Sequence, residues 1–102
     1  MGDADLASPY FGAYAGRHAA TRFRNVTKLR SEEYGRFVAE LVAVRQQAGI
    51  SQYELARRLG EDQPWVSKYE HSRRKLDVIE FLRVMDALGA DPAEFVRRLK
   101  WR

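Results

Sequence analysis

A short run of polar side chains, with Gln63, Ser67 and Lys68 at helical spacing, carries the most specific chemistry in the sequence. An amide such as that of Gln63 can pair bidentately with adenine, and a lysine such as Lys68 can donate to O6 and N7 of guanine. Val66 and Tyr69 lie three residues apart and give the same segment a narrow apolar edge. We therefore expect a helix that is anchored along one edge and exposes a polar front.

Positive charge flanks this segment on both sides. The net charge is +3 over residues 1–30, −2 over residues 31–70 and +3 over residues 71–102, for a total of +4. Such a distribution suits a central element that enters a groove of nucleic acid while its neighbours grip phosphates. The three consecutive cations that follow the polar helix are Arg73, Arg74 and Lys75.

The elements that must position these side chains are two short helices joined by a tight turn. Ser51 can cap the first helix, and Glu54, three residues later, is placed to close a capping box. Gly60 suits a left-handed helix end, and Asp62 can cap the second helix. The signals predict a helix-turn-helix over about residues 51–70, although spacing and caps alone equally fit an ordinary helical hairpin in a small bundle.

The remaining chain also reads as helical. An apolar period begins at Ser31, Asp77 and Glu80 can form a second capping box, and Asp91 with Pro92 can start a last helix. The prediction is an all-α, five-helix domain over residues 31–102. Residues 1–30 lack a sustained apolar stripe, so we expect a basic arm, at least partly disordered, that is either a solvated tail or a segment that reaches an adjacent groove.

Other kinds of chemistry find little support in the sequence. The chain has no cysteine, and its two histidines, His18 and His71, have no carboxylate at triad or metal-ligand spacing. We expect no enzymatic activity, no metal and no cofactor. The absence of an apolar run long enough to cross a bilayer, and of a signal-peptide pattern, leads us to expect a cytoplasmic protein without a membrane partner.

From about Arg36 to Leu99 the chain resembles the Xre-type, phage-repressor-like helix-turn-helix proteins. The residues that carry the likeness, in unbroken register, are Arg45, Gly49–Gln52, Glu54–Ala56, Leu59–Gly60, Val66–Glu70 and Leu88–Pro92.

The resemblance implies that the protein binds double-stranded DNA and assigns roles to matching positions. Arg45 and Glu70 match a structural ion pair that joins the first helix to the end of the recognition helix. Pro64 stands where many relatives have a polar side chain, and Trp65 can touch a thymine methyl or pack on the protein itself. The expected base-reading residues are Gln63, Pro64, Trp65, Ser67 and Lys68. The expected phosphate-binding residues are Gln52, Tyr53, Arg73, Arg74 and Lys75.

These features favour a transcriptional repressor that occupies a palindromic operator. A single recognition helix reads few base pairs, so we expect a homodimer, with an exposed apolar patch of Phe95, Leu99 and Trp101 as its interface. Two alternatives stay open. One is an antitoxin that binds DNA and also a toxin, with the amino-terminal arm as the segment that contacts this protein partner. The other is a protein-interaction adaptor that uses the same fold.

Overall fold

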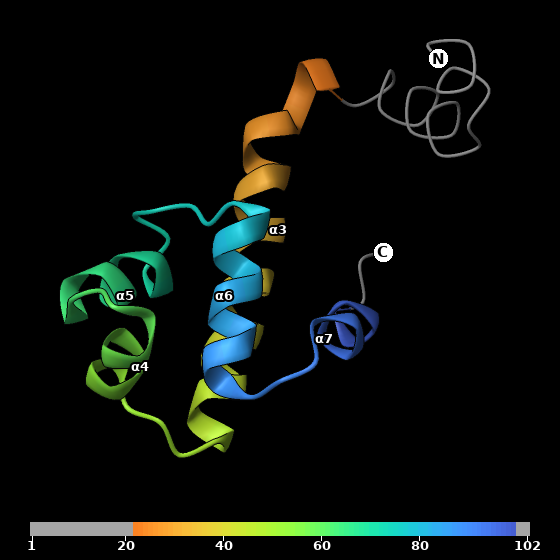
Figure 1. Ribbon diagram of the computed structural model, residues 1–102. Coiled ribbons are helices and arrows are strands. Elements are labelled where there is room, and N and C mark those ends of the chain that lie inside the picture. Colours follow the sequence, from red (N-terminus) through yellow and green to blue (C-terminus); the bar gives the residue numbers. More distant parts are fainter. Residues whose placement is uncertain (1–21, 100–102) are drawn as a thin grey trace, which may run out of the picture. The chain divides into compact units, whose positions relative to one another are not determined.

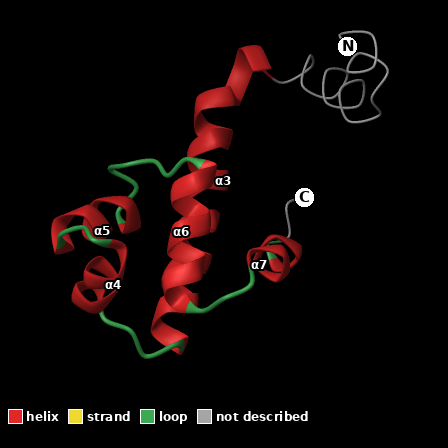
Figure 2. Cartoon of the chain, in the orientation of Figure 1, coloured by secondary structure: helices red, strands yellow, loops and turns green. Residues whose placement is uncertain are grey.

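The computed structural model describes residues 22–99, which form five helices and no strand. Figures 1 and 2 show the arrangement of these helices. The chain divides between Glu32 and Glu33, and the unit from Glu33 onward contains the helix-turn-helix. The all-α prediction is confirmed. The helices are α3 (Arg22–Gln47), α4 (Gln52–Leu59), α5 (Gln63–Glu70), α6 (Val78–Leu88) and α7 (Pro92–Arg98).

Helix α3 begins earlier than the sequence analysis predicts. Its first residue is Arg22 rather than a residue near Ser31, so the last nine residues of the predicted arm are helical. No glycine or proline lies between Gly16 and Gly35, and a helix can therefore extend through this segment without an apolar stripe. Residues 1–21, which make up the rest of the predicted arm, lie outside the described part of the chain.

Local capping sets the other helix ends. Ser51 Oγ accepts the backbone N–H of Glu54 at 3.0 Å, and Asp62 Oδ1 accepts that of Trp65 at 3.0 Å. Gly60 adopts the left-handed conformation, with φ of 72°, that closes α4. The capping box predicted at Ser51 and Glu54 is only half formed, because the Glu54 carboxylate turns to Arg57 and Arg58 instead.

A second capping box, between Asp77 and Glu80, is complete. The side chain of each residue accepts the backbone N–H of the other, at 2.7 and 3.0 Å. Asp91 caps α7 by accepting the N–H of Ala93 at 3.0 Å. These contacts satisfy amide groups that the first turn of each helix leaves without a partner inside the helix.

A single core holds α4 and α5 against the rest of the domain. Leu55, Val66 and Tyr69 are fully buried, as are Val84 and Met85 of α6. Helix α4 packs against both α5 and α6. The two helices of the motif are thus held from behind, and α5 keeps its opposite side free.

Two of the three residues of the apolar patch predicted at the carboxy terminus lie in the described part of the chain, and neither is fully exposed. Phe95 is a core residue, with 5% of its surface accessible, and its ring lies 5.8 Å from Phe37 and 5.3 Å from Phe81. Leu99 is half-buried against the same core. Trp101 lies outside the described residues. The amphipathic stripe of α7 therefore faces the domain's own interior, and Phe95 cannot contribute to a dimer interface.

Within the described residues, no helix has the length and apolar character needed to cross a membrane.

Candidate nucleic-acid interface

The helix-turn-helix occupies the predicted positions. Helices α4 and α5 have eight residues each and are joined by the turn of Gly60, Glu61 and Asp62. In α5 the side chains of Val66 and Tyr69 are fully buried, whereas Pro64 and Lys68 are exposed. Helix α5 therefore has the narrow apolar edge and polar front expected of a recognition helix.

An ion pair between Arg45 and Glu70 connects the motif to α3. Arg45 Nε donates to Glu70 Oε2 at 2.6 Å and Arg45 Nη2 donates to Oε1 at 3.1 Å, which makes the pair bidentate. Arg45 Nη1 also donates to the carbonyl oxygen of Ile50 at 2.8 Å. The two side chains are only 11% and 4% exposed. The pair thus joins α3, the turn before α4 and the end of α5 in a place shielded from water.

The same carboxylate starts a relay of hydrogen bonds that ends on the front of α5. Gln52 Nε2 donates to Glu70 Oε1 at 2.7 Å, and Gln63 Nε2 donates to Gln52 Oε1 at 2.8 Å. Both ends of the Gln52 amide are therefore engaged, and one amide proton of Gln63 is used. The sequence analysis named all four residues of this relay but did not predict that Gln52 and Gln63 bind each other.

The first turn of α4 adds an aromatic side chain beside Gln52. Tyr53 is 72% exposed, and it lies in the first turn of a helix. Helix amino termini attract anions because their amide groups point outward and carry partial positive charge. Gln52 and Tyr53 therefore lie at a helix end whose partial positive charge favours an anion.

The loop after α5 turns back toward the end of this helix and forms hydrogen bonds with it. Ser72 has a φ of 60°, in the left-handed region, and the backbone N–H groups of Arg73 and Arg74 both donate to the carbonyl oxygen of Lys68, at 2.8 and 3.3 Å. This bend keeps the basic loop next to the last turn of α5. The side chain of Arg73 is exposed there.

The three loop cations, for which one common role is predicted, have different surroundings. Arg74 forms an ion pair with Glu80, and its guanidinium carbon lies 4.8 Å from the centre of the Trp65 ring. Lys75 Nζ lies 4.4 Å from the centre of the Tyr34 ring, although the lysine itself is exposed. Arg74 is thus bound within the domain through Glu80 and Trp65, and the phosphate-binding role stays a prediction.

Trp65 packs on the protein. Its ring meets Tyr69 edge-on at 5.7 Å, receives Arg74 on its face and is half-buried against the core. Of the two roles left open for Trp65, the structure shows the packing contact. The sequence allowed a packing role for Trp65, but no residue near it in the sequence indicated that Arg74 is its partner.

Electrostatics around the motif follow from these contacts. Side-chain hydrogen bonds from Arg57 and Arg58 lower the pKa of Glu54 to about 2. Burial raises the pKa of Tyr69 above its usual value, so this side chain is neutral at physiological pH. The carboxylate at the start of α4 is therefore already neutralised by neighbouring arginines, which lessens its repulsion of an incoming phosphate.

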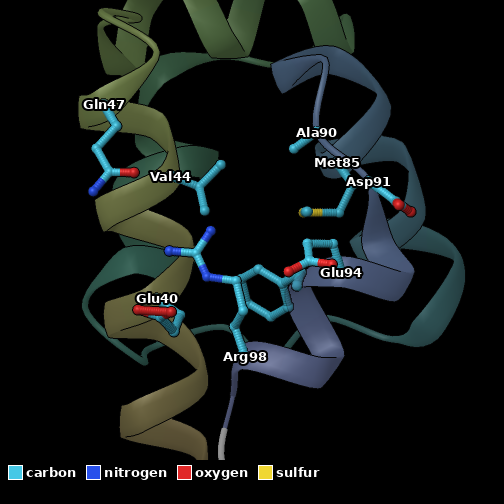
Figure 3. Close-up of a pocket in the computed structure, with 9 residues that line it drawn as sticks. Glu40, Val44, Gln47, Met85, Ala90, Asp91, Glu94 and Arg98 are labelled. Atoms are coloured by element: carbon cyan, nitrogen blue, oxygen red, sulfur yellow. The ribbon is translucent and has the colours of Figure 1, made fainter.

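A small cavity of about 150 Å³ opens elsewhere on the domain. Val44, Met85 and Phe95 supply apolar walls, and the carboxylates of Glu40 and Glu94 lie beside it, as Figure 3 shows for the labelled residues. Its lining comes from α3, α6, α7 and the turn before α7. The acidic side chains make this surface unsuited to nucleic acid, in contrast to the front of α5.

Comparison with known proteins identifies the same helix-turn-helix. A family model described as a helix-turn-helix domain matches residues 36–97. An Xre-family-like protein from Pseudomonas syringae pv. tomato str. DC3000 is 42% identical, with a TM-score of 0.69 over 74% of this chain and 94% of that one. The restriction-modification controller protein C.Esp1396I has the same fold at 21% identity, with a TM-score of 0.62 over 66% of this chain and 88% of the controller.

No protein of curated function matches the chain. The family match and the 42% identical structure both cover the segment that holds α4, α5 and the Arg45–Glu70 pair. From this match and from the geometry of its motif, the chain belongs to the Xre-type helix-turn-helix family of DNA-binding transcription regulators.

Proposed function

We propose that the protein is a sequence-specific repressor that blocks transcription by occupying a palindromic operator as a dimer. The observation that carries the proposal is the relay from Arg45 through Glu70 and Gln52 to Gln63. It fixes one amide at the start of each motif helix, and a preorganised donor set loses less entropy when it binds. Such order suits recognition of one defined sequence.

The exposed front of α5 supplies the base contacts. Gln63 and Lys68 are the principal readers, with adenine and guanine as their respective partners, and Ser67 adds a hydroxyl between them. Pro64 is exposed and lies next to Gln63, where it can contact an apolar base edge such as the thymine methyl. Trp65 is half-buried, packs against Tyr69 and Arg74, and so supports α5 instead of reading a base.

Phosphate contacts flank the readers on both sides. Gln52 and Tyr53 serve one strand at the start of α4, while Arg73 and Lys75 serve the backbone beyond the end of α5. Phosphate contacts fix the register of a protein on the duplex, and base contacts then specify the sequence. Sequence preference is thus expected to depend on α5, and salt dependence on the flanks.

We place the interface of this dimer on another surface than the predicted one, because Phe95 is buried in the core. Three apolar side chains of α6 are exposed: Val78 at 69%, Ile79 at 65% and Leu82 at 41%. They stand within two turns of one helix and form what we call the α6 face. A palindrome presents two half-sites, so a second copy of the chain that packs on this face would let two recognition helices bind together.

Sedimentation velocity tests the α6 face with a matched control. Ile79→Glu places a charge in the proposed interface, and Val96→Glu places the same charge on an equally exposed residue of α7. Ile79→Glu should yield a monomer at micromolar concentration while Val96→Glu stays dimeric. The opposite result would return the interface to the carboxy-terminal helix, and a monomeric wild type would reject the dimer.

The repressor proposal is tested by selection of duplexes from a random pool, followed by fluorescence anisotropy across a salt series. The wild type should enrich a palindromic sequence and bind it at least about 1,000-fold more tightly than a scrambled duplex. Gln63→Ala should lose much of that ratio, whereas Gln46→Ala, an exposed glutamine of α3, should keep it. Equal and weak binding to both duplexes would reject the proposal and leave the adaptor function.

A further inference from the structure

Arg74, in the basic loop after α5, contacts three helices of the domain. Its guanidinium lies over the Trp65 ring of α5 at 4.8 Å and forms an ion pair with Glu80 of α6. Its carbonyl oxygen accepts a hydrogen bond from the hydroxyl of Tyr34, on α3, at 3.3 Å. A single loop residue thus contacts side chains from α3, α5 and α6, through its own side chain and its backbone.

The Tyr34 hydroxyl also accepts the backbone N–H of Leu76 at 2.9 Å. It therefore bridges the two residues on either side of Lys75, whose ammonium group lies on the ring of the same tyrosine. The path of the loop from Arg74 to Leu76 is fixed along one side of α3. Arg73, the exposed cation directly before this segment, takes its position from that path.

Glu80 has two functions that require the two oxygens of its carboxylate. Oε1 accepts the backbone N–H of Asp77 and caps α6, while Oε2 binds the guanidinium of Arg74. The capping contact holds the carboxylate in one orientation, so the anchor for Arg74 is itself fixed. The side chains of Arg74 and Glu80 are 35% and 25% exposed, which limits competition from water.

These contacts commit most of the guanidinium to the domain. One face lies over the indole, one Nη donates to Glu80, and Nε is buried with no hydrogen-bond partner among the described residues. The arginine is better suited to hold the recognition helix than to bind the nucleic acid.

We propose that Arg74 is a positioning residue for DNA recognition: with Glu80 it clamps Trp65 and the loop, and thereby fixes both the first turn of α5 and the side chain of Arg73. This proposal rests on the function proposed above. It differs from a phosphate contact in its consequence, because the loss of a positioning residue harms selectivity whereas the loss of a phosphate anchor weakens binding to all sequences alike.

Glu80→Gln separates the two roles. Glutamine retains an oxygen for the cap of α6, since glutamine also serves at this position of a capping box, and Arg74 keeps its charge. If Arg74 clamps Trp65, the variant should lose about tenfold in the ratio of selected to scrambled affinity. If Arg74 is a phosphate anchor, its release from Glu80 should raise affinity for both duplexes and steepen the salt dependence, which would overturn the proposal.

Two controls complete the experiment. Glu94→Gln removes the same charge from an exposed ion pair on α7 and reports the effect of net charge alone. Arg74→Gln should reduce selectivity with an unchanged slope of log affinity against log salt, whereas Arg73→Ala should reduce the slope by about one. A reduced slope with intact selectivity for Arg74→Gln would also overturn the proposal.

The clamp can be observed without DNA. In a Trp101→Phe background the fluorescence reports Trp65, and both Glu80→Gln and Arg74→Gln should shift its emission to longer wavelength because the indole becomes more exposed to water. If the wild type binds both duplexes equally and the variants still show this emission shift, the repressor proposal is rejected but the contact of Arg74 with Trp65 is supported. Unchanged emission in both variants would reject the clamp.

Discussion

The amide nitrogen of Gln63 donates to the amide oxygen of Gln52 at 2.8 Å, so the first residues of the two motif helices are joined directly. In the proposed function, Gln63 reads a base and Gln52 holds a phosphate. Register on the backbone and recognition of the sequence are thereby linked through one hydrogen bond.

Gln52 and Gln63 should be energetically coupled in DNA binding. Because each orients the other, Gln52→Ala should reduce sequence selectivity as well as affinity. A double-mutant cycle with Gln63→Ala, measured by anisotropy on the selected duplex, should give a coupling of about 0.5–3 kcal/mol. Additive losses would show that the two amides act independently on DNA.

Removal of one partner of the Arg45–Glu70 pair should destabilise the motif strongly. Arg45→Met leaves the Glu70 carboxylate buried without its cation, and we expect the free energy of unfolding to fall by about 3–5 kcal/mol in urea titrations. The double variant Arg45→Met with Glu70→Leu should recover part of the loss, since neither charge then remains unpaired. As a control, Arg97→Ala breaks an exposed pair and should leave the urea midpoint unchanged.

Lys68 and Arg73 should affect binding in different ways. Lys68→Ala removes a base reader, so it should relax the preference at one position of each half-site by about 1–3 kcal/mol. Arg73→Ala removes a phosphate contact, so it should weaken all duplexes alike and reduce the salt slope by about one. If the two variants gave the same profile across duplexes and salt, the division of roles would be wrong.

Acid should weaken the fold partly through Glu54. Its pKa in the folded protein is lowered to about 2 by Arg57 and Arg58, below the ordinary value of 4.5. The ionised Glu54 carboxylate therefore stabilises the folded state fully above its unfolded-state pKa, and this contribution is lost as pH falls from about 5 toward 2. Glu54→Gln should make the thermal midpoint less dependent on pH over that range. High salt should reduce the difference in midpoint between the wild type and the variant, because both arginines are exposed.

The sequence predicted the motif well because its helix ends depend on local contacts. Ser51, Gly60 and Asp62 act on backbone groups within a few residues, so the bounds of α4 and α5 could be inferred from them. The start of α3 could not be inferred in this way. Its amino-terminal turns have neither an apolar stripe nor a helix breaker, and the search for a stripe could only place the start near Ser31.

Other features depend on neighbours distant in the sequence. Arg73, Arg74 and Lys75 are alike as consecutive cations, but the Arg74 side chain contacts Trp65 and Glu80, and Lys75 meets the ring of Tyr34, which lies far earlier in the sequence. The stripe of α7 gave no indication whether Phe95 faces the core or a partner. The competition for Glu54 between its cap and two arginines was visible in the spacing, yet the outcome depends on side-chain geometry.

The recognition helix contains constrained and unconstrained positions in alternation. Gln63 is tied to the relay, Trp65 to Arg74, and Val66 and Tyr69 to the core, whereas Pro64 and Lys68 project from the domain. A lineage that carries this domain can therefore exchange the two projecting residues and acquire a new operator with little cost to folding. Paralogous regulators of the same build could diverge in target within one genome while they retain the same scaffold.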